Sequence, residues 1–268
     1  MTTDLIYDVG MNNGDDTAYY LHRGYRVVAI EANPKLVEAA RERFQSEIAE
    51  GRLIIRNVGI AESEEELPFW VCERHSEWSS FHWSIASRDE SPHHQITVPC
   101  IRFQSVVQEF GTPFYLKIDI EGSDELCLKD LSPETAPPYI SVEASDIALL
   151  DLLRDLGYDR FKCISQFHFL PLEFPPAPVQ LAFEEKLRAG QPLDEFRTFD
   201  AWEFLSGSSG VFGSDLPGRW QTLDEMKTTF AHFGELQRAG VATPFWNDRG
   251  YSFWCDFHAT RQATLAKA

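Results

Sequence analysis

Short apolar runs and segments with helical spacing alternate through the first 165 residues of the chain. The apolar runs, rich in β-branched residues, predict strands at 5–9, 26–34, 52–58, 114–120, 139–145 and 158–164. Segments with apolar residues every three or four positions predict helices at 15–22, 34–48, 123–131 and 146–157. Strands separated by helices of this length favour right-handed crossovers and a mostly parallel, doubly wound α/β sheet.

The alternation changes after residue 165. Three prolines interrupt "FPPAPVQL", a glycine- and serine-rich loop follows at 207–218, and an aromatic strand is predicted at 251–259. Two further runs in the first part, at 67–72 and 95–101, predict peripheral strands around a polar, aromatic loop. We therefore expect a core at 1–165, an insertion or cap packed on it at 166–250, and a final edge strand and tail at 251–268.

Composition and charge narrow the possible partners. The 268 residues carry a formal net charge of -18, which repels nucleic-acid phosphates and anionic lipid headgroups, so we expect no nucleic acid and no membrane as partner. No apolar stretch is long enough to span a bilayer, and the first ten residues are neither basic nor signal-like. Five widely spaced cysteines favour reduced thiols, and hence a cytoplasmic protein, over disulfides. The oligomeric state stays open.

The stretch "YDVGMNNGDDT" is typical of a strand, a glycine loop and a helix that together bind a nucleotide. Gly10 and Gly14 allow positive φ and close approach of a ligand to the backbone. Asp15 and Asp16, in the first helical turn, would repel a pyrophosphate. A zwitterionic tail fits better, because its ammonium can meet a carboxylate while its own carboxylate meets backbone N–H groups. S-adenosylmethionine has such a tail.

An acid follows at the distance that a ribose requires. Glu31 ends the second predicted strand, 21 positions after Gly10, where a carboxylate can accept hydrogen bonds from both ribose hydroxyls. Asn57, after the third strand, can bond the edge of an adenine. These features favour an adenosine site without separating NAD from S-adenosylmethionine. The loop alone is equally compatible with a tight strand–helix turn that binds nothing.

Four motifs resemble the FkbM-type S-adenosylmethionine-dependent methyltransferases in order and spacing: "DVGMNNGDDT", "VVAIEANP", "TVPCIRFQSVVQEFG" and "LKIDIEGSDELCLKDL". The resemblance covers roughly residues 5–165, and Asn12 matches the family where other methyltransferases carry glycine. It implies a Rossmann-like class I methyltransferase fold and, usually, O-methylation of a hydroxyl on a natural product or sugar. The acceptor itself is not implied.

With S-adenosylmethionine as the expected cofactor, the binding residues lie in the glycine loop, at the ends of the next two strands, in the serine pair of the aromatic loop and after the fourth central strand. The expected set is Asp8, Gly10, Asn12, Asn13, Gly14, Thr17, Glu31, Ala32, Asn57, Val58, Ser80 and Asp119.

The catalytic candidates lie in "LKIDIEG". Strand alternation would place Lys117, Asp119 and Glu121 on one side, near the carboxyl end of a central strand. We expect Asp119 and Glu121 to face methyl donor and acceptor, with Lys117 orienting them; a purely structural lysine–carboxylate network is the alternative. His82 is a second candidate base. A divalent metal shared by Asp119 and Glu143 is conceivable, but such carboxylates are commoner as hydrogen-bond acceptors, so no metal is expected.

The aromatic residues of the insertion are expected to form the core of a cap or to wall the acceptor pocket; they are Trp202, Phe204, Phe212, Trp220, Phe245 and Trp246. The sequence thus predicts a methyltransferase that O-methylates a small-molecule, carbohydrate or natural-product hydroxyl. Two alternatives stay open: a nucleotide-dependent oxidoreductase and a non-catalytic S-adenosylmethionine-binding module. Asn12 and the acids at 15 and 16 count against the oxidoreductase.

Overall fold

The structure is a computed structural model that describes residues 4–205, 207–241, 243 and 254–266. The chain forms two compact units, Met1–Pro138 and Tyr139–Ala268. This division differs from the boundary expected at residue 165, because the strands expected at 139–145 and 158–164 belong to the second unit. Within the described residues, no helix is both long enough and apolar enough to cross a membrane.

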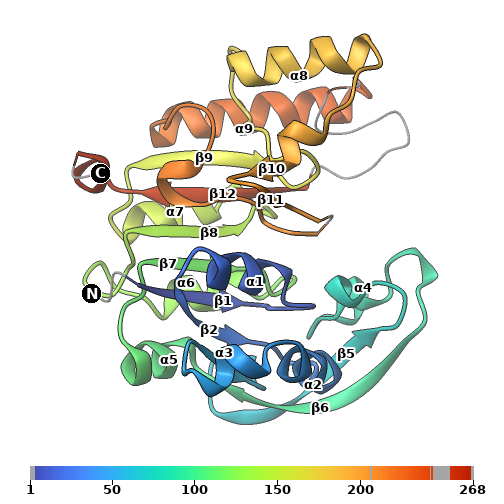
Figure 1. Cartoon of the computed structure of the whole chain (residues 1–268), viewed down its shortest axis with the longest axis vertical. Coiled ribbons are helices and arrows are strands. Elements are labelled where there is room, and N and C mark those ends of the chain that lie inside the picture. The colour runs from blue at the N-terminus through green and yellow to red at the C-terminus, as the bar shows by residue number, and fades with distance from the viewer. Residues whose placement is uncertain (1–3, 206, 242, 244–253, 267–268) are drawn as a thin grey trace. The chain divides into compact units, whose positions relative to one another are not determined.

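The first unit contains four parallel strands in the order β3-β2-β1-β7 (Figure 1). Their bounds are β1 (Leu5–Val9), β2 (Arg26–Ile30), β3 (Leu53–Arg56) and β7 (Tyr115–Ile118). All five residues of β1 are buried, as its continuous apolar run predicts for a central strand. The four strands therefore confirm the expected parallel α/β architecture.

Different helices cover the two faces of these strands. On one face, Tyr20 of α1 (Asp15–His22) packs edge-on against Tyr115 of β7, with ring centroids 5.8 Å apart. On the other face, Tyr7 of β1 packs edge-on against Phe103 of α5 (Phe103–Phe110) at 6.2 Å. The Tyr7 hydroxyl also donates to the Gly111 carbonyl after α5. Helices on both faces confirm the doubly wound arrangement.

The helix expected at 34–48 is divided at Phe44. The first part, α2 (Pro34–Arg43), begins at an Asn33 cap whose side chain accepts from the Lys35 N–H. The second part, α3 (Gln45–Ala49), follows Phe44, which has a non-helical φ of -111°. The Phe44 ring lies directly under Gly14, where a Cβ would come within 2.8 Å of it. Packing of this ring against the glycine loop thus accompanies the break in the helix.

A smaller three-stranded sheet belongs to the same unit, in the order β4-β6-β5. The middle strand β6 (His93–Ile101) runs parallel to β4 (Gly59–Ile60) and antiparallel to β5 (Glu65–Cys72). Both expected peripheral strands are present. Residues 73–92 connect them, and we call this connection the β5–β6 arm; it contains η1 (Ser76–Trp78), α4 (Trp83–Ala86) and η2 (Arg88–Glu90).

In the second unit, β12 (Cys255–Thr260) lies between β8 (Tyr139–Glu143) and β9 (Arg160–Ser165) and is antiparallel to both. The expectation of a final edge strand is therefore wrong. Every residue of β12 is buried, including the polar Asp256, His258 and Thr260, and a neighbouring strand pairs with its backbone on each side. The apolar run identified a strand but carried no information about its neighbours.

The rest of the second unit is mainly helical. Its elements are α7 (Leu149–Asp155), α8 (Pro178–Arg188), η3 (Asp194–Arg197), β10 (Thr198–Phe199), β11 (Trp202–Glu203), η4 (Gly213–Asp215), α9 (Leu223–Arg238) and α10 (Gln262–Leu265). The α6 helix (Asp124–Lys129) belongs to the first unit. Thr222 and Glu225 form a capping box at the start of α9. Phe204 and Phe212 are buried, as the cap-core interpretation requires, whereas Phe245 and Trp246 lie outside the described residues.

Candidate active site

The glycine loop after β1 depends on three left-handed residues. Gly10, Asn12 and Gly14 have φ values of 85°, 49° and 81°. A Cβ on Gly10 would lie 1.7 Å from the Asp119 carbonyl oxygen, so only glycine fits there. Asparagine is one of the few residues other than glycine that adopt the left-handed backbone region readily. Asn12 therefore keeps the turn that a glycine would allow, and it adds a side chain whose Oδ1 accepts from Ser76 Oγ at 2.8 Å.

The N–H groups of this loop are largely engaged within the protein. Those of Gly10 and Met11 both donate to the Ile30 carbonyl, and that of Gly14 donates to the Met11 carbonyl. The Asp15 N–H donates to Asn13 Oδ1 at 3.0 Å. A phosphate-binding loop instead directs such groups at its ligand. This pattern argues against a pyrophosphate at the loop. It also gives no support to the expectation that N–H groups of the loop contact the carboxylate of an amino-acid tail.

The two acids that follow the loop each have a cationic partner. Asp15 pairs with Arg43 at 2.8 Å, and Arg43 also donates to the Asn13 carbonyl at 3.0 Å. The carboxylate of Asp16 is buried and lies 3.6 Å from Lys117 Nζ. Both carboxylates are thus already paired with cations of the protein, so neither is the unpaired acid that a ligand's ammonium group would need.

Glu31 lies just beyond β2 and is buried. Its Oε2 accepts from the Asn12 N–H at 2.9 Å, and its Oε1 accepts from the Asn33 N–H at 2.8 Å. Burial raises the pKa of this carboxyl, against the opposing effect of the two backbone donors. A carboxylate offers about four lone-pair positions, so each oxygen retains capacity for one more donor, such as a ribose hydroxyl.

The residues expected beside an adenine surround this turn. Asn57 Nδ2 donates to the carbonyls of Glu31 and Ala32 at 2.9 and 3.1 Å. Its amide hydrogens are therefore used to hold the turn after β2, and only its Oδ1 can meet an adenine amino group. Val58, the next residue, is half-buried.

Lys117 lies at the centre of a buried ionic network. Its Nζ donates to the Gly10 carbonyl at 3.0 Å and lies 3.4 to 3.6 Å from carboxylate oxygens of Asp8, Asp16 and Asp119. The other oxygen of Asp8 accepts from Thr17 Oγ1 at 2.6 Å, and Asp8 and Thr17 are fully buried. Lys117 therefore joins the first strand, the glycine loop and α1 to the loop that follows β7, as the structural alternative anticipated.

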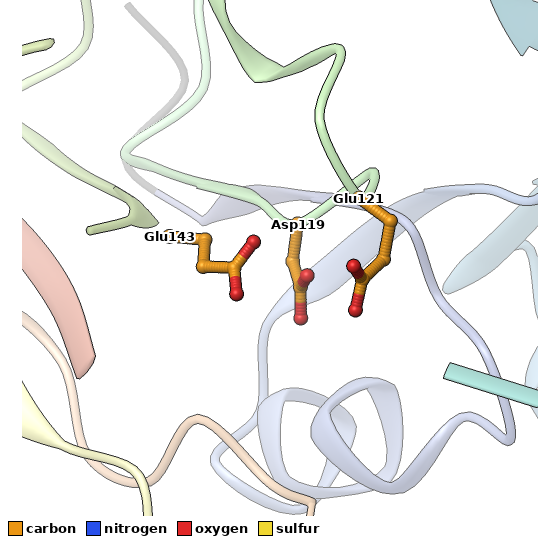
Figure 2. Close-up of side chains that lie close together, drawn as sticks. All are labelled: Asp119, Glu121 and Glu143. Carbon is orange, nitrogen blue, oxygen red and sulfur yellow. The ribbon is translucent and has the colours of Figure 1, made fainter. Parts of the chain in front are cut away.

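Asp119 and Glu121 extend in the same direction from the loop after β7 (Figure 2), and their carboxylate oxygens lie within 4.8 Å of each other. Strand alternation does not place Glu121, because β7 ends at Ile118 and Glu121 has a left-handed φ of 47°. Each acid has its own cation: Asp119 lies 3.6 Å from Lys117 Nζ, and Glu121 pairs with Arg88 Nη1 at 3.2 Å. Glu143 ends β8 in the second unit, so the shared-metal alternative stays a prediction.

Sequence reasoning missed Asp124, which holds this loop in shape. Its two carboxylate oxygens accept from the N–H groups of Ile120 at 3.0 Å and Gly122 at 3.2 Å. Burial raises the pKa of Asp124 to about 6, and the charge of Asp119 adds to that effect. The signal available in the sequence was an aspartate two residues after Gly122 and in the first turn of a predicted helix, where such side chains bond nearby backbone.

The β5–β6 arm adds further contacts to both loops. Ser80 Oγ is fully buried and donates to the Glu121 carbonyl at 2.7 Å. The His82 ring and the Cδ1 atom of Ile85 lie against Gly122. A Cβ on Gly122 would lie 2.7 Å from Ile85 Cδ1 and 3.2 Å from the His82 ring. Ser80 and His82 were candidates from the sequence; Ser76 and Arg88 were missed, because nothing local marks a serine or arginine that bonds a loop far along the chain.

A family model described as Methyltransferase FkbM domain matches residues 8–160, more than half of the chain. The chain belongs to the FkbM methyltransferase family. The matched region contains the end of β1, the glycine loop, Glu31 and the loop after β7, which are parts of the site described above. The resemblance seen in the motifs is therefore confirmed, and with it the class I methyltransferase fold.

Solved methyltransferases are similar to parts of this chain at low identity. The FkbM methyltransferase of Methylobacillus flagellatus KT is 16% identical over 58% of this chain and 38% of its own, with a TM-score of 0.41. The precorrin-6y C5,15-methyltransferase of Geobacter metallireducens GS-15 is 13% identical over 61% and 67%, with a TM-score of 0.35. The chain thus spans well under half of that FkbM structure. None of the curated proteins matches it.

The acceptors of this site in the FkbM-family chain are compatible with an adenosine that has a cationic tail. Glu31 supplies buried acceptors suited to a ribose diol, and the N–H groups of Gly10, Met11, Asn12, Gly14 and Asp15 are bonded within the protein and not directed at a ligand. The Asp119 side chain is one-third exposed, which leaves a carboxylate accessible beside the loop. Ribose acceptors next to an accessible acid suit S-adenosylmethionine better than a dinucleotide.

Proposed function

We propose that the protein is an S-adenosylmethionine-dependent methyltransferase that methylates a hydroxyl group of a small molecule, sugar or natural product. The observation that carries this proposal is the Glu31 carboxylate, buried at the end of β2 and bonded to the Asn12 N–H of the glycine loop. That arrangement supports a ribose held over a loop that does not bind phosphate. Membership of a methyltransferase family supports the reaction class.

In this proposal the residues that would hold the cofactor lie at and after the carboxyl ends of β1, β2 and β7. Glu31 would accept hydrogen bonds from the ribose hydroxyls, and Ala32, Asn57 and Val58 would lie beside the adenine. Gly10, Asn12, Asn13 and Gly14 form the turn beneath the tail, while Asp8 and Thr17 support it from below. Asp119 meets the ammonium group, and Ser80 keeps the neighbouring loop in place.

When bound, S-adenosylmethionine supplies an electrophilic methyl group whose C–S bond breaks as the C–O bond to the acceptor forms. The protein contributes alignment, which is worth roughly 7–11 kcal/mol in favourable intramolecular reactions. Glu121 takes the proton of the acceptor hydroxyl, and His82, against the same loop, is the second candidate base. Lys117 orients Asp119, and Arg88 orients Glu121. No metal is required by this scheme.

The proposed setting is the cytoplasm. Five free cysteines are buried in the described residues, which fits a reducing compartment. The net charge of -18 disfavours nucleic acid as the acceptor and supports a small molecule instead.

Thermal-shift measurements with S-adenosylhomocysteine and with NADH test the cofactor assignment. Stabilisation by S-adenosylhomocysteine alone is expected, and stabilisation by NADH alone would support the oxidoreductase alternative and overturn the proposal. Transfer of a labelled methyl group to hydroxylated acceptors then tests the reaction. Tight S-adenosylhomocysteine binding without transfer to any acceptor would instead indicate a non-catalytic binding module.

A further inference from the structure

A short turn at the start of the β5–β6 arm is held on the glycine loop by one hydrogen bond. We call residues 74–78 the flap, and we propose that it closes the methyl-donor site, with the bond from Ser76 Oγ to Asn12 Oδ1 as its latch. The donor enters and leaves while this bond is open. The inference rests on the proposed function, because it assigns a gate to the S-adenosylmethionine site.

The proposed ribose acceptor is buried in the structure. Only 7% of Glu31 is exposed, and its carboxylate accepts from the Asn12 N–H. Asn12 bonds Glu31 through its backbone and Ser76 through its side chain, so a single residue lies between the flap and the acceptor. A ribose hydroxyl must come within hydrogen-bond distance of this buried carboxylate, so a neighbouring segment has to move to admit it.

The other segments around the site are each held by several contacts. The turn after β2 is fixed by two bonds from Asn57 Nδ2. Two N–H groups of the glycine loop donate to the Ile30 carbonyl, and Lys117 Nζ donates to the Gly10 carbonyl. The backbone of Gly10 also lies directly against the Asp119 carbonyl. These segments therefore form the fixed wall of the donor site.

The flap is bonded mainly to itself. The rings of His75 and Trp78 lie 4.2 Å apart, and the Trp78 N–H donates to the His75 carbonyl, which makes a compact turn around η1. Arg74 and Glu77 are exposed. Among the described residues, the bond from Ser76 is the one hydrogen bond that joins the flap to the glycine loop. A segment with so few outside contacts opens at a lower free-energy cost than the wall around it.

Both ends of the flap are anchored to the small sheet. At one end, the Glu73 N–H donates to the Pro92 carbonyl, just before β6. Beyond the other end, Ser80 exchanges two backbone hydrogen bonds with Trp70 of β5. The apolar core of this sheet packs against Ala32, the residue after the proposed ribose acceptor. The small sheet thus fixes both hinges beside the donor site, and the turn between them is the part that opens.

A latch of this kind changes rates more than affinity. The bond from Ser76 to Asn12 joins two protein groups and includes no atom of the donor, so it stabilises the closed flap with and without ligand. Its loss should raise the association and dissociation rate constants together, by roughly 2- to 10-fold, the equivalent of one net hydrogen bond. The dissociation constant is the ratio of these rate constants and should stay within about twofold of its original value.

Surface plasmon resonance with S-adenosylhomocysteine measures both rate constants. Ser76→Ala removes the latch and should raise them together. Ser76→Thr keeps a hydroxyl and should restore the rate constants of the unsubstituted protein. Ser84→Ala, at an exposed serine of the same arm, is the matched control and should change neither. Hydrogen exchange followed by mass spectrometry gives a second readout, because residues 74–78 should exchange faster in Ser76→Ala while β5 is unchanged.

Two results with Ser76→Ala would overturn the latch. Unchanged rate constants would show that this bond does not limit entry or exit. Faster dissociation with unchanged association would make Ser76 a support of the glycine loop and not a gate. Both results presuppose that the unsubstituted protein binds S-adenosylhomocysteine. Absence of that binding would instead overturn the proposed function, and the latch with it.

Discussion

The Glu31 carboxylate accepts the backbone N–H of Asn12 at 2.9 Å, which joins the end of β2 to the turn after β1. One side chain therefore shapes the glycine loop and presents acceptors beside it. The same loop position is left-handed, so Asn12 can direct its N–H towards Glu31 and its side chain towards Ser76. The structural role of this pair and its proposed role in cofactor binding therefore depend on the same contact.

Replacing Glu31 with alanine is expected to weaken S-adenosylhomocysteine binding by about 1–3 kcal/mol, the usual cost of losing a buried hydrogen-bond partner. Isothermal titration calorimetry measures the change. Glu38→Ala removes an exposed acid of α2 and serves as the control. Unchanged affinity in a folded Glu31→Ala protein would rule out its role at the ribose.

Glu121→Gln should retain cofactor affinity while turnover falls by about 100-fold or more, as expected when a general base is lost. The substitution keeps the size of the side chain, and its amide oxygen can still accept from Arg88. Steady-state methyl transfer, together with calorimetry, provides both readouts. Glu125→Gln, at an exposed acid paired with Lys129 on α6, is the control. Full activity in Glu121→Gln would remove this residue from the mechanism.

Two glycines with similar backbones should respond very differently to alanine. Gly51 has a φ of 70° and nothing within 4 Å of an added Cβ, so Gly51→Ala should cost only the left-handed penalty of about 1–2 kcal/mol. Gly10→Ala places its Cβ 1.7 Å from the Asp119 carbonyl oxygen and should cost more than about 4 kcal/mol. Urea unfolding, or soluble yield if the variant does not fold, compares them. Equal losses would contradict the close contact between the loops.

Asp124 should make stability depend on pH. Its pKa is raised from 3.8 to about 6, so between these values the folded protein holds a proton that the unfolded chain has released. The contribution to stability is therefore complete below about pH 4 and is lost as the pH rises through about 6, by about 3 kcal/mol in total.

Urea unfolding of the unsubstituted protein and of Asp124→Asn, compared across that interval, measures this contribution. The stability difference between the two proteins should shrink as the pH rises, because asparagine does not titrate. The constant loss of a hydrogen bond in Asp124→Asn changes the size of the difference but not its slope. A difference that grows with pH would show that the two backbone donors outweigh burial at this carboxylate.

The parts of the fold that local pattern determines could be predicted from the sequence. The helix α1 and the strand β1 have the expected bounds, because their apolar spacing and the glycines between them act over a few residues. Glu31 lies at the end of β2 for the same reason. These positions needed no knowledge of the rest of the chain.

Features that depend on distant partners could not be predicted. The break at Phe44 accompanies the packing of its ring under Gly14, and the left-handed Glu121 accompanies the two bonds made by Asp124. Arg88 reaches Glu121 from another part of the chain. A local pattern records which residues are apolar, whereas these contacts depend on which loops meet in three dimensions.

The double pairing of β12 has a consequence for the order of folding. In the first unit, β1 and β2 pair across a short stretch of chain, whereas β1 and β7 pair across residues 10–114. In the second unit, Cys255 pairs with Ser165 and Asp256 with Glu143, so both pairings of β12 also close long stretches of chain at an entropic cost. Because high contact order slows folding, the pairing of β1 with β2 should form before the pairings made by β7 and by β12. Until residues 255–260 arrive, the edges of β8 and β9 that β12 covers are unpaired, and in this interval the chain is exposed to aggregation through those strand edges.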